Sequence, residues 1–183
     1  MGAGVALNCA LRYPPRLLGL VLLRPAWLDG PMAENARLFS FIAQLLREHG
    51  PEAGAKIFKQ SAVYSSILQE SSDSAESLVA LFADPRAVET VARLERIPQD
   101  APNRDRSEWG QIAIPTLVLA NRCDPIHPLE FGQVLARAIP HAQFAELTPK
   151  SIDLAKYTAE LRRHLAEFLQ SRFGQAKPPL SSS

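Results

Sequence analysis

An unbroken apolar run, Leu17 to Leu23, constrains the fold of this chain more than any other feature. A run of this length without polar alternation is typical of a parallel strand that is covered on both faces. It is far shorter than the roughly 20 apolar residues that cross a bilayer. We therefore expect a central strand in a sheet with helices on both sides.

The rest of the sequence alternates between helical and strand patterns. Small apolar residues from Gly2 onward predict a buried helix and a chain that starts inside structure, and Pro14-Pro15 ends that helix. Alternation with short connections indicates right-handed crossovers and a parallel sheet. The later elements expected are a strand Thr116–Ala120, a helix Leu129–Ile139, a strand Gln143–Leu147 and a helix Leu154–Phe173. The fold class is thus α/β with three predicted parallel strands.

Residues 31–108 have a helical period and predict an insertion between the first two strands. One helix carries a stripe from Leu38 to Leu46 and ends at Gly50-Pro51, and another begins at Asp84-Pro85. A polar segment with two prolines, 98–108, is expected to return to the sheet as a loop. The predicted organisation is a sheet and helix part at 1–30, a helical cap at 31–108, a second core part at 109–173 and a disordered tail at 174–183.

Charge and cysteine content exclude several classes of function. The chain has 20 basic and 19 acidic side chains, a net charge of +1, and no basic cluster, which argues against a nucleic-acid or membrane-surface partner. Cys9 and Cys123 lie far apart without the spacing of metal ligands, so neither a zinc site nor a disulfide scaffold is indicated. We expect reduced thiols, a cytoplasmic location, and no cofactor or metal.

Three segments come directly after the expected strands, at the edge of a parallel sheet where ligands bind. They are Arg24–Trp27, Asn121–Pro128 and Thr148–Asp153. Because the helical insertion begins after the first of them, we expect it to cover the same edge. Any catalytic or binding residues should therefore be sought in these three loops.

The landmarks of these loops resemble those of the α/β-hydrolase family. Met1-Gly2-Ala3-Gly4 is similar to the residues that come after the nucleophile in an elbow of the type Gly-x-Ser-Met-Gly-Ala-Gly. Arg24–Trp27 resembles the strand end before a helical cap, Ile114–Val118 the strand before the acid, and Asn121-x-x-Asp124-x-x-x-Pro128 the acid loop. The resemblance covers nearly the whole chain, but only as the carboxyl-terminal part of that fold, so we expect an incomplete α/β-hydrolase.

This resemblance implies roles for two residues. Asp124 matches the acid that orients and charges the histidine, although an Asp-Pro pair is also a common turn. The nucleophilic serine would stand one residue before Met1, so Met1 marks an oxyanion-donor position only. The family's histidine commonly lies in the loop after the last strand, where Thr148–Asp153 offers none.

The remaining candidates are ambiguous from sequence. His127 is the histidine nearest to Asp124 and is the candidate base, although a histidine at such a place more often faces solvent. His49, His141 and His164 are better explained by a helix end, a turn and the polar face of a helix. Trp27 could line a substrate pocket or pack beneath the cap.

The sequence supports two hypotheses about function. In the first, the chain is a truncated serine α/β-hydrolase for an ester or related acyl bond of a small molecule, inactive as it stands because it lacks the nucleophile. In the second, it is a non-catalytic hydrolase-like protein that binds a small apolar ligand or a partner. In both, the unpaired edge of the strand Leu17–Leu23 predicts self-association.

Overall fold

The computed structural model describes residues 1–31 and 34–174. The expected disordered tail lies outside the described residues, except for Gly174. The elements in chain order are α1 (Gly2–Arg12), η1 (Pro14–Arg16), β1 (Leu20–Leu23), η2 (Glu34–Ala36), α2 (Arg37–Gln60), α3 (Ala62–Glu70), α4 (Ser72–Ala83), α5 (Ala87–Arg96), η3 (Ile97–Gln99), η4 (Arg106–Gln111), β2 (Thr116–Asn121), α6 (Leu129–Ala138), β3 (Gln143–Leu147) and α7 (Leu154–Phe173).

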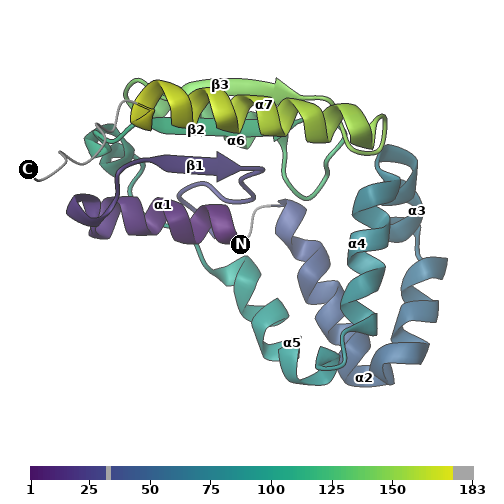
Figure 1. Cartoon of the computed structure of the whole chain (residues 1–183). Helices are drawn as coiled ribbons and strands as arrows, with labels where there is room; N and C mark the ends of the chain where they lie inside the picture. The colour runs from purple at the N-terminus through teal and green to yellow at the C-terminus, as the bar shows by residue number, and fades with distance from the viewer. Residues whose placement is uncertain (32–33, 175–183) are drawn as a thin grey trace, which may run out of the picture.

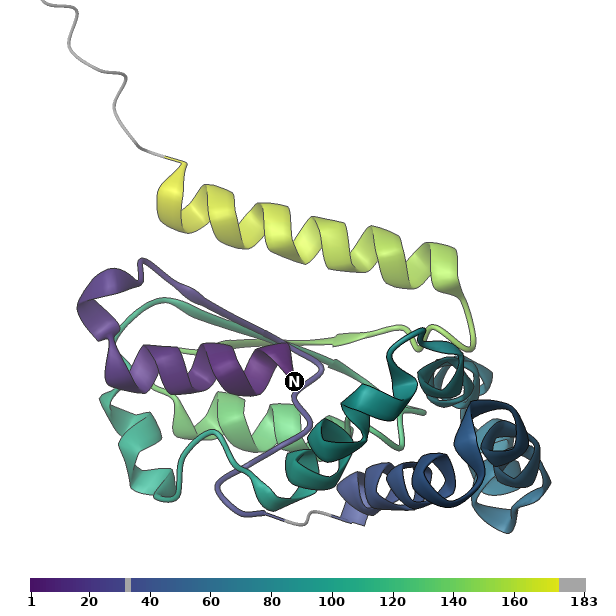
Figure 2. The ribbon, with the colours of Figure 1, turned by 90° about the horizontal axis from the view of Figure 1, so that it is seen from below.

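The three strands form one parallel sheet in the order β1-β2-β3. Leu20 of β1 is paired with Thr116 of β2, and Leu117 of β2 with Gln143 of β3. Helix α7 covers one face of the sheet, while α1 and α6 cover the other (Figure 2). The prediction of a three-stranded parallel α/β fold is confirmed.

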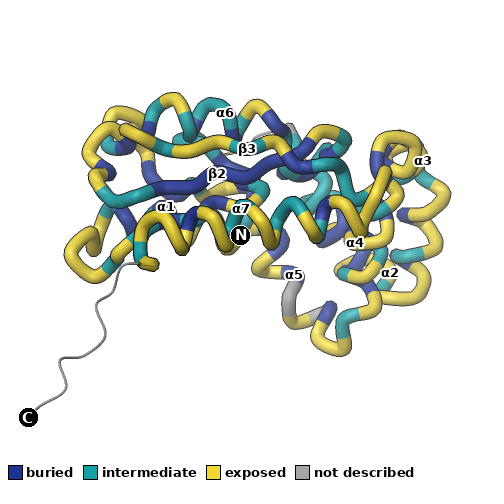
Figure 3. The backbone as a smooth tube through the Cα atoms, turned by 45° about the horizontal axis from the view of Figure 1, so that its top comes forward, coloured by how far each residue is buried: buried dark blue, intermediate teal, exposed yellow. Residues whose placement is uncertain are grey.

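The first strand is shorter than its apolar run predicts. Only Leu20–Leu23 pairs with β2, while Leu18 is 79% exposed and Leu23 is 36% exposed. The run therefore begins as a surface segment, and its expected cover on both faces is wrong at both ends. The expectation of a central strand is also wrong for the described sheet, because β1 lies at its edge and β2 lies between β1 and β3. Strand β2 is buried throughout and runs as a continuous dark segment through Figure 3.

Two hydrophobic clusters hold the helices on the sheet. On one face, Leu7 of α1, Leu22 of β1 and Leu135 of α6 pack around the fully buried Trp109. On the other face, β2 and β3 contact α7 through Tyr157 and Phe168 and their neighbours. Burial of such side chains from water is the main contribution to the stability of the sheet.

Helices α2–α5, which we call the helical insertion, have a core of their own. Ile42, Leu46, Phe58, Leu78 and Phe82 pack together there with little exposure. The insertion lies beyond the end toward which the three strands point (Figure 1). It therefore covers the edge of the sheet where the sequence places the candidate loops.

Within the insertion, the predicted helix break at Gly50-Pro51 is present, but the predicted helix start at Asp84-Pro85 is displaced. Helix α2 is interrupted at Gly50, whose φ of 72° belongs to the left-handed region that glycine tolerates, and Pro51 starts its second half. Helix α5 begins at Ala87 rather than at Asp84, because the Asp84 carboxylate instead accepts a hydrogen bond from the Arg86 amide in a turn before the helix. The expected loop 98–108 also contains short 3-10 turns.

Candidate functional site

Two of the candidate loops turn sharply as soon as their strands end. Arg24, directly after β1, has a φ of 49°, and Cys123, just after β2, has a φ of 53°. Residues other than glycine rarely adopt this left-handed conformation, and such residues cluster at functional sites. Both turns bring the following residues beneath the helical insertion.

Asp124 is the centre of this site. Its side chain is 1% exposed, and its Oδ1 accepts hydrogen bonds from the amides of Ile126, at 3.2 Å, and His127, at 3.0 Å. Oδ2 lies 2.6 Å from both Nε and Nη2 of Arg24. The carboxylate is therefore saturated with donors, as a buried charge must be.

His127 completes the environment of the carboxylate. Its Nδ1 lies 3.0 Å from Oδ1 and 3.2 Å from Oδ2 of Asp124, and its side chain is 21% exposed. An acid bonded to Nδ1 holds the imidazole with Nε2 turned away from the acid, which is the orientation that a general base needs. The structure thus brings together Asp124 and His127, the candidate acid and the candidate base of the sequence analysis.

Opposing effects set the pKa of Asp124. Burial alone would raise the pKa of the carboxyl group, but the hydrogen bond and charge of His127 and the guanidinium of Arg24 outweigh burial and hold the pKa below its ordinary value. Asp124 is therefore ionised at neutral pH, as the acid partner of a histidine must be.

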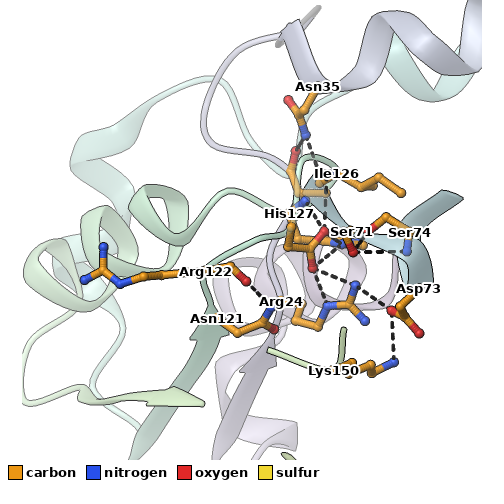
Figure 4. A network of polar contacts seen from close by, with 12 residues as sticks. Arg24, Asn35, Ser71, Asp73, Ser74, Asn121, Arg122, Ile126, His127 and Lys150 are labelled. Carbon is orange, nitrogen blue, oxygen red and sulfur yellow. Dashed lines mark hydrogen bonds and ion pairs between the residues drawn. The ribbon is translucent and has the colours of Figure 1, made fainter. Parts of the chain in front are cut away.

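A chain of charges connects the site to the helical insertion (Figure 4). Nη2 of Arg24 lies 3.9 Å from the carboxylate of Asp73, which belongs to the first turn of α4. The same carboxylate lies 3.9 Å from Nζ of Lys150, in the loop after β3. The loops after β1 and β3 thus meet one acidic side chain of the insertion, and Arg24 links that side chain to Asp124 in the loop after β2.

Asn35 ties two of the loops together. Its Nδ2 donates to the carbonyl of Ala26, at 3.1 Å, and to that of Ile126, at 2.7 Å. Its Oδ1 is buried and has no hydrogen-bond partner in the part of the chain that the structure describes. The segment leading into α2 therefore fixes the distance between the loop after β1 and the loop after β2.

The sequence missed Arg24, Asp73 and Asn35 as members of the site. Arg24 stands in one of the predicted loops, but its partner Asp124 is 100 residues away, and no local pattern connects them. Asp73 resembles an ordinary first-turn acid of a helix. Lys150 lies in the loop where the family has its histidine, and the structure places it beside Asp73 and over the ring of Tyr157.

The other histidines lie apart from the carboxylate. His49 is near Glu48, His164 is near Glu167, and His141, with a φ of 57°, occupies the turn before β3. Two serines of the insertion, Ser71 and Ser74, are buried, but they bond to each other where Ser71 caps α4. Within residues 1–31 and 34–174, no group of three or more histidine, cysteine or acidic side chains is arranged to hold a metal ion.

Trp27 lies in a pocket at the junction of α1 and the helical insertion. The pocket has a volume of about 620 Å³ and is lined by Met1, Gly4, Val5, Asn8, Trp27, Ala92, Arg93, Arg96, Ile97, Asp100, Ala101 and Pro102. Trp27 is 8% exposed, and its Nε1 donates to the carbonyl of Ile97 at 3.3 Å. Both interpretations of Trp27 therefore have support, because the ring packs under the insertion and also forms part of a pocket wall.

Comparisons with known proteins identify the fold around this site. The chain is 21% identical to an enol-lactonase from Burkholderia xenovorans LB400, with a TM-score of 0.65 over 93% of this chain and 63% of that one. It is 23% identical to a thermophilic esterase from Thermogutta terrifontis, with a TM-score of 0.61 over 91% of this chain and 62% of that one. The architecture is therefore that of the α/β-hydrolases.

Sequence comparison agrees with this fold. A protein of Stutzerimonas stutzeri whose name describes a carbamate hydrolase, RutD, is 31% identical over 177 residues, or 91% of this chain. No protein-family model matches the chain. The chain spans between 54% and 64% of the length of the curated relatives that it matches. The chain therefore resembles the α/β-hydrolases and contains part of their fold.

Among the described residues, no helix has the length and apolar character needed to cross a membrane.

Proposed function

We propose that this chain is the carboxyl-terminal part of a serine hydrolase that cleaves an ester or related acyl bond of a small molecule. The observation that carries the proposal is the contact of 3.0 Å between Nδ1 of His127 and Oδ1 of the buried, ionised Asp124. Because relatives of the chain are named as carbamate hydrolases, carbamates should be tested as well as esters.

In the proposed mechanism, Asp124 keeps the proton of His127 on Nδ1 and stabilises the imidazolium that forms during the reaction. Nε2 is then free to accept the proton of a serine hydroxyl and to return it to the leaving group. By the family resemblance, that serine precedes Met1 in a longer form of the protein, and the amide of Met1 helps to hold the oxyanion. The helical insertion would act as a cap that excludes water.

A second candidate function is non-catalytic ligand binding on the same scaffold. Two observations favour it: both Nε and Nη2 of Arg24 lie 2.6 Å from Oδ2 of Asp124, and Thr148–Asp153 has no histidine. In this alternative the Arg24 pair neutralises the acid, and Asp124 only shapes its loop.

The test uses the reading frame extended upstream, so that a Gly-x-Ser precedes Met1, and short acyl esters and carbamates as substrates. We expect turnover by the extended protein, a loss of about 10⁴-fold in Asp124→Asn, and little change in the matched control Cys123→Ala. A fluorophosphonate probe should label the extended protein and leave the chain of 183 residues unlabelled.

Three other results would contradict parts of this proposal. If the extended protein is folded but inactive on every ester and carbamate tried, the binding function takes precedence. If it is active and Asp124→Asn retains turnover within a few-fold of the parent, the acid lies elsewhere. Labelling of a serine in the chain of 183 residues would show that the nucleophile is one of its own.

A further inference from the structure

The pocket beside Trp27 has a charge pattern that the hydrolase proposal leaves unexplained. It does not include Asp124, His127 or Arg24. Its volume of about 620 Å³ is within the roughly 300–1,000 Å³ of ordinary small-molecule sites.

The walls of the pocket are fixed to each other at two points. On one side, Nδ2 of Asn8 in α1 donates to the carbonyl of Pro102 at 2.5 Å. On the other, the indole of Trp27 donates to the carbonyl of Ile97. Gly4 lets α1 lie close to both opposing segments, because a Cβ at this position would already contact Pro102 and Trp27. The pocket is therefore a built feature of the junction between α1 and the segment after α5.

The lining combines an apolar surface with an excess of positive charge. Val5, Trp27 and Ile97 provide apolar groups, while Arg93 and Arg96 come from the last turn of α5. Among the described residues of the lining, Asp100 carries the only carboxylate, and its Oδ1 already accepts a hydrogen bond from the Ala101 amide. Two guanidinium groups against one carboxylate leave the pocket suited to an anion.

Both guanidinium groups are available to a ligand. The structure gives Arg93 and Arg96 no ion pair with any residue in its described ranges, whereas Arg47 on the same insertion is paired with Glu95. A guanidinium presents donors in a planar fork that matches both oxygens of a carboxylate. Two such groups at the rim of an apolar pocket would recognise a molecule with an apolar body and a carboxylate end.

We propose that this pocket binds a small organic carboxylate, with its apolar part against Val5 and Trp27 and its carboxylate held by Arg93 and Arg96. The inference names the substrate class of the proposed hydrolase and rests on that proposal for its link to catalysis. Because Met1 lines the same pocket, a serine placed directly before Met1 would lie close to the bound molecule.

Equilibrium binding tests this inference without any turnover, so its failure is distinct from failure of the hydrolase proposal. The probes are 4-phenylbutyrate and its neutral isostere 4-phenylbutanamide, titrated into the purified chain by calorimetry. We expect the carboxylate to bind about tenfold more tightly than the amide, as charge-assisted hydrogen bonds are stronger than neutral ones. Fluorescence of Trp27 provides a second signal, because Trp109 is fully buried outside the pocket.

The double variant Arg93→Gln/Arg96→Gln should lose this preference and retain its affinity for the amide. The control is Arg137→Gln, an exposed arginine in the last turn of α6 that does not line the pocket, and it should bind both probes like the parent. Equal binding of the two probes by the parent, or no binding of either, would overturn the proposal. So would an unchanged preference in the double variant, which would assign the anion to the Met1 amine instead.

Discussion

Replacement of Arg24 by methionine tests the energetic role of the charge pair at the site. The change removes both nitrogens that lie 2.6 Å from Oδ2 of Asp124, a carboxylate that is 1% exposed. Breaking a buried ion pair costs about 3–5 kcal/mol. Because His127 and two backbone amides still form hydrogen bonds with the carboxylate, we expect the free energy of unfolding to fall by about 3 kcal/mol, the lower end of that range.

The measurement is the free energy of unfolding in urea. The matched control is Arg122→Met, which removes an arginine that is 66% exposed and is paired with Glu146 on the surface. An exposed pair contributes about 0–1 kcal/mol, so the control should remain close to the parent. Equal losses in Arg24→Met and Arg122→Met would refute the argument that the Arg24 pair stabilises the buried acid.

Three further predictions concern packing, pH and association. A Cβ at Gly132 would lie 2.8 Å from Cβ of Ala120, so Gly132→Ala should lower the free energy of unfolding by about 1–3 kcal/mol. In the control Gly110→Ala the new Cβ meets open space, and the free energy of unfolding should change by less than about 0.5 kcal/mol. Because the pKa of Asp124 is lowered in the folded state, the ionised carboxylate stabilises the fold above the pKa of the unfolded state, and this stabilisation is lost as the pH falls below about 4. The free energy of unfolding should therefore fall less on acid titration in Asp124→Asn than in the parent. Equal losses in the two proteins would contradict this. The second edge of β1 has no strand partner within residues 1–31 and 34–174, so the chain should self-associate at tens of micromolar in sedimentation velocity, and a monodisperse monomer would contradict that expectation.

The elements of the fold could be predicted because their signals are local. Apolar runs and short connections predicted parallel strands, and β2 occupies Thr116–Asn121, where the strand Thr116–Ala120 was expected. The start of β1 could not be predicted, because Leu17 and Leu18 have the same apolar character as the paired residues after them. Pairing with Thr116 begins only at Leu20, and this register is a property of the assembled sheet.

The site was predictable only where its residues are neighbours in sequence. The contact between Asp124 and His127 spans three positions within one loop. The acid-loop pattern indicated Asp124, whereas His127 was only the nearest histidine and was expected more often to face solvent. Arg24 and Asp73 reach the same point from distant elements, and their roles depend on how the insertion packs over the sheet. The pocket charges of Arg93 and Arg96 resemble ordinary helix-end cations in sequence.

The proposed mechanism depends most on His127 acting as the base that Asp124 orients. The direct measurement is kcat on a short acyl ester for His127→Gln in the protein extended upstream to include Gly-x-Ser, with His141→Gln, a change at the exposed turn before β3, as control. We expect a loss of at least about 10³-fold for His127→Gln, the scale on which removal of a triad member acts, and parent-like turnover for His141→Gln. Turnover of His127→Gln within a few-fold of the parent would contradict the mechanism and place the base outside this loop.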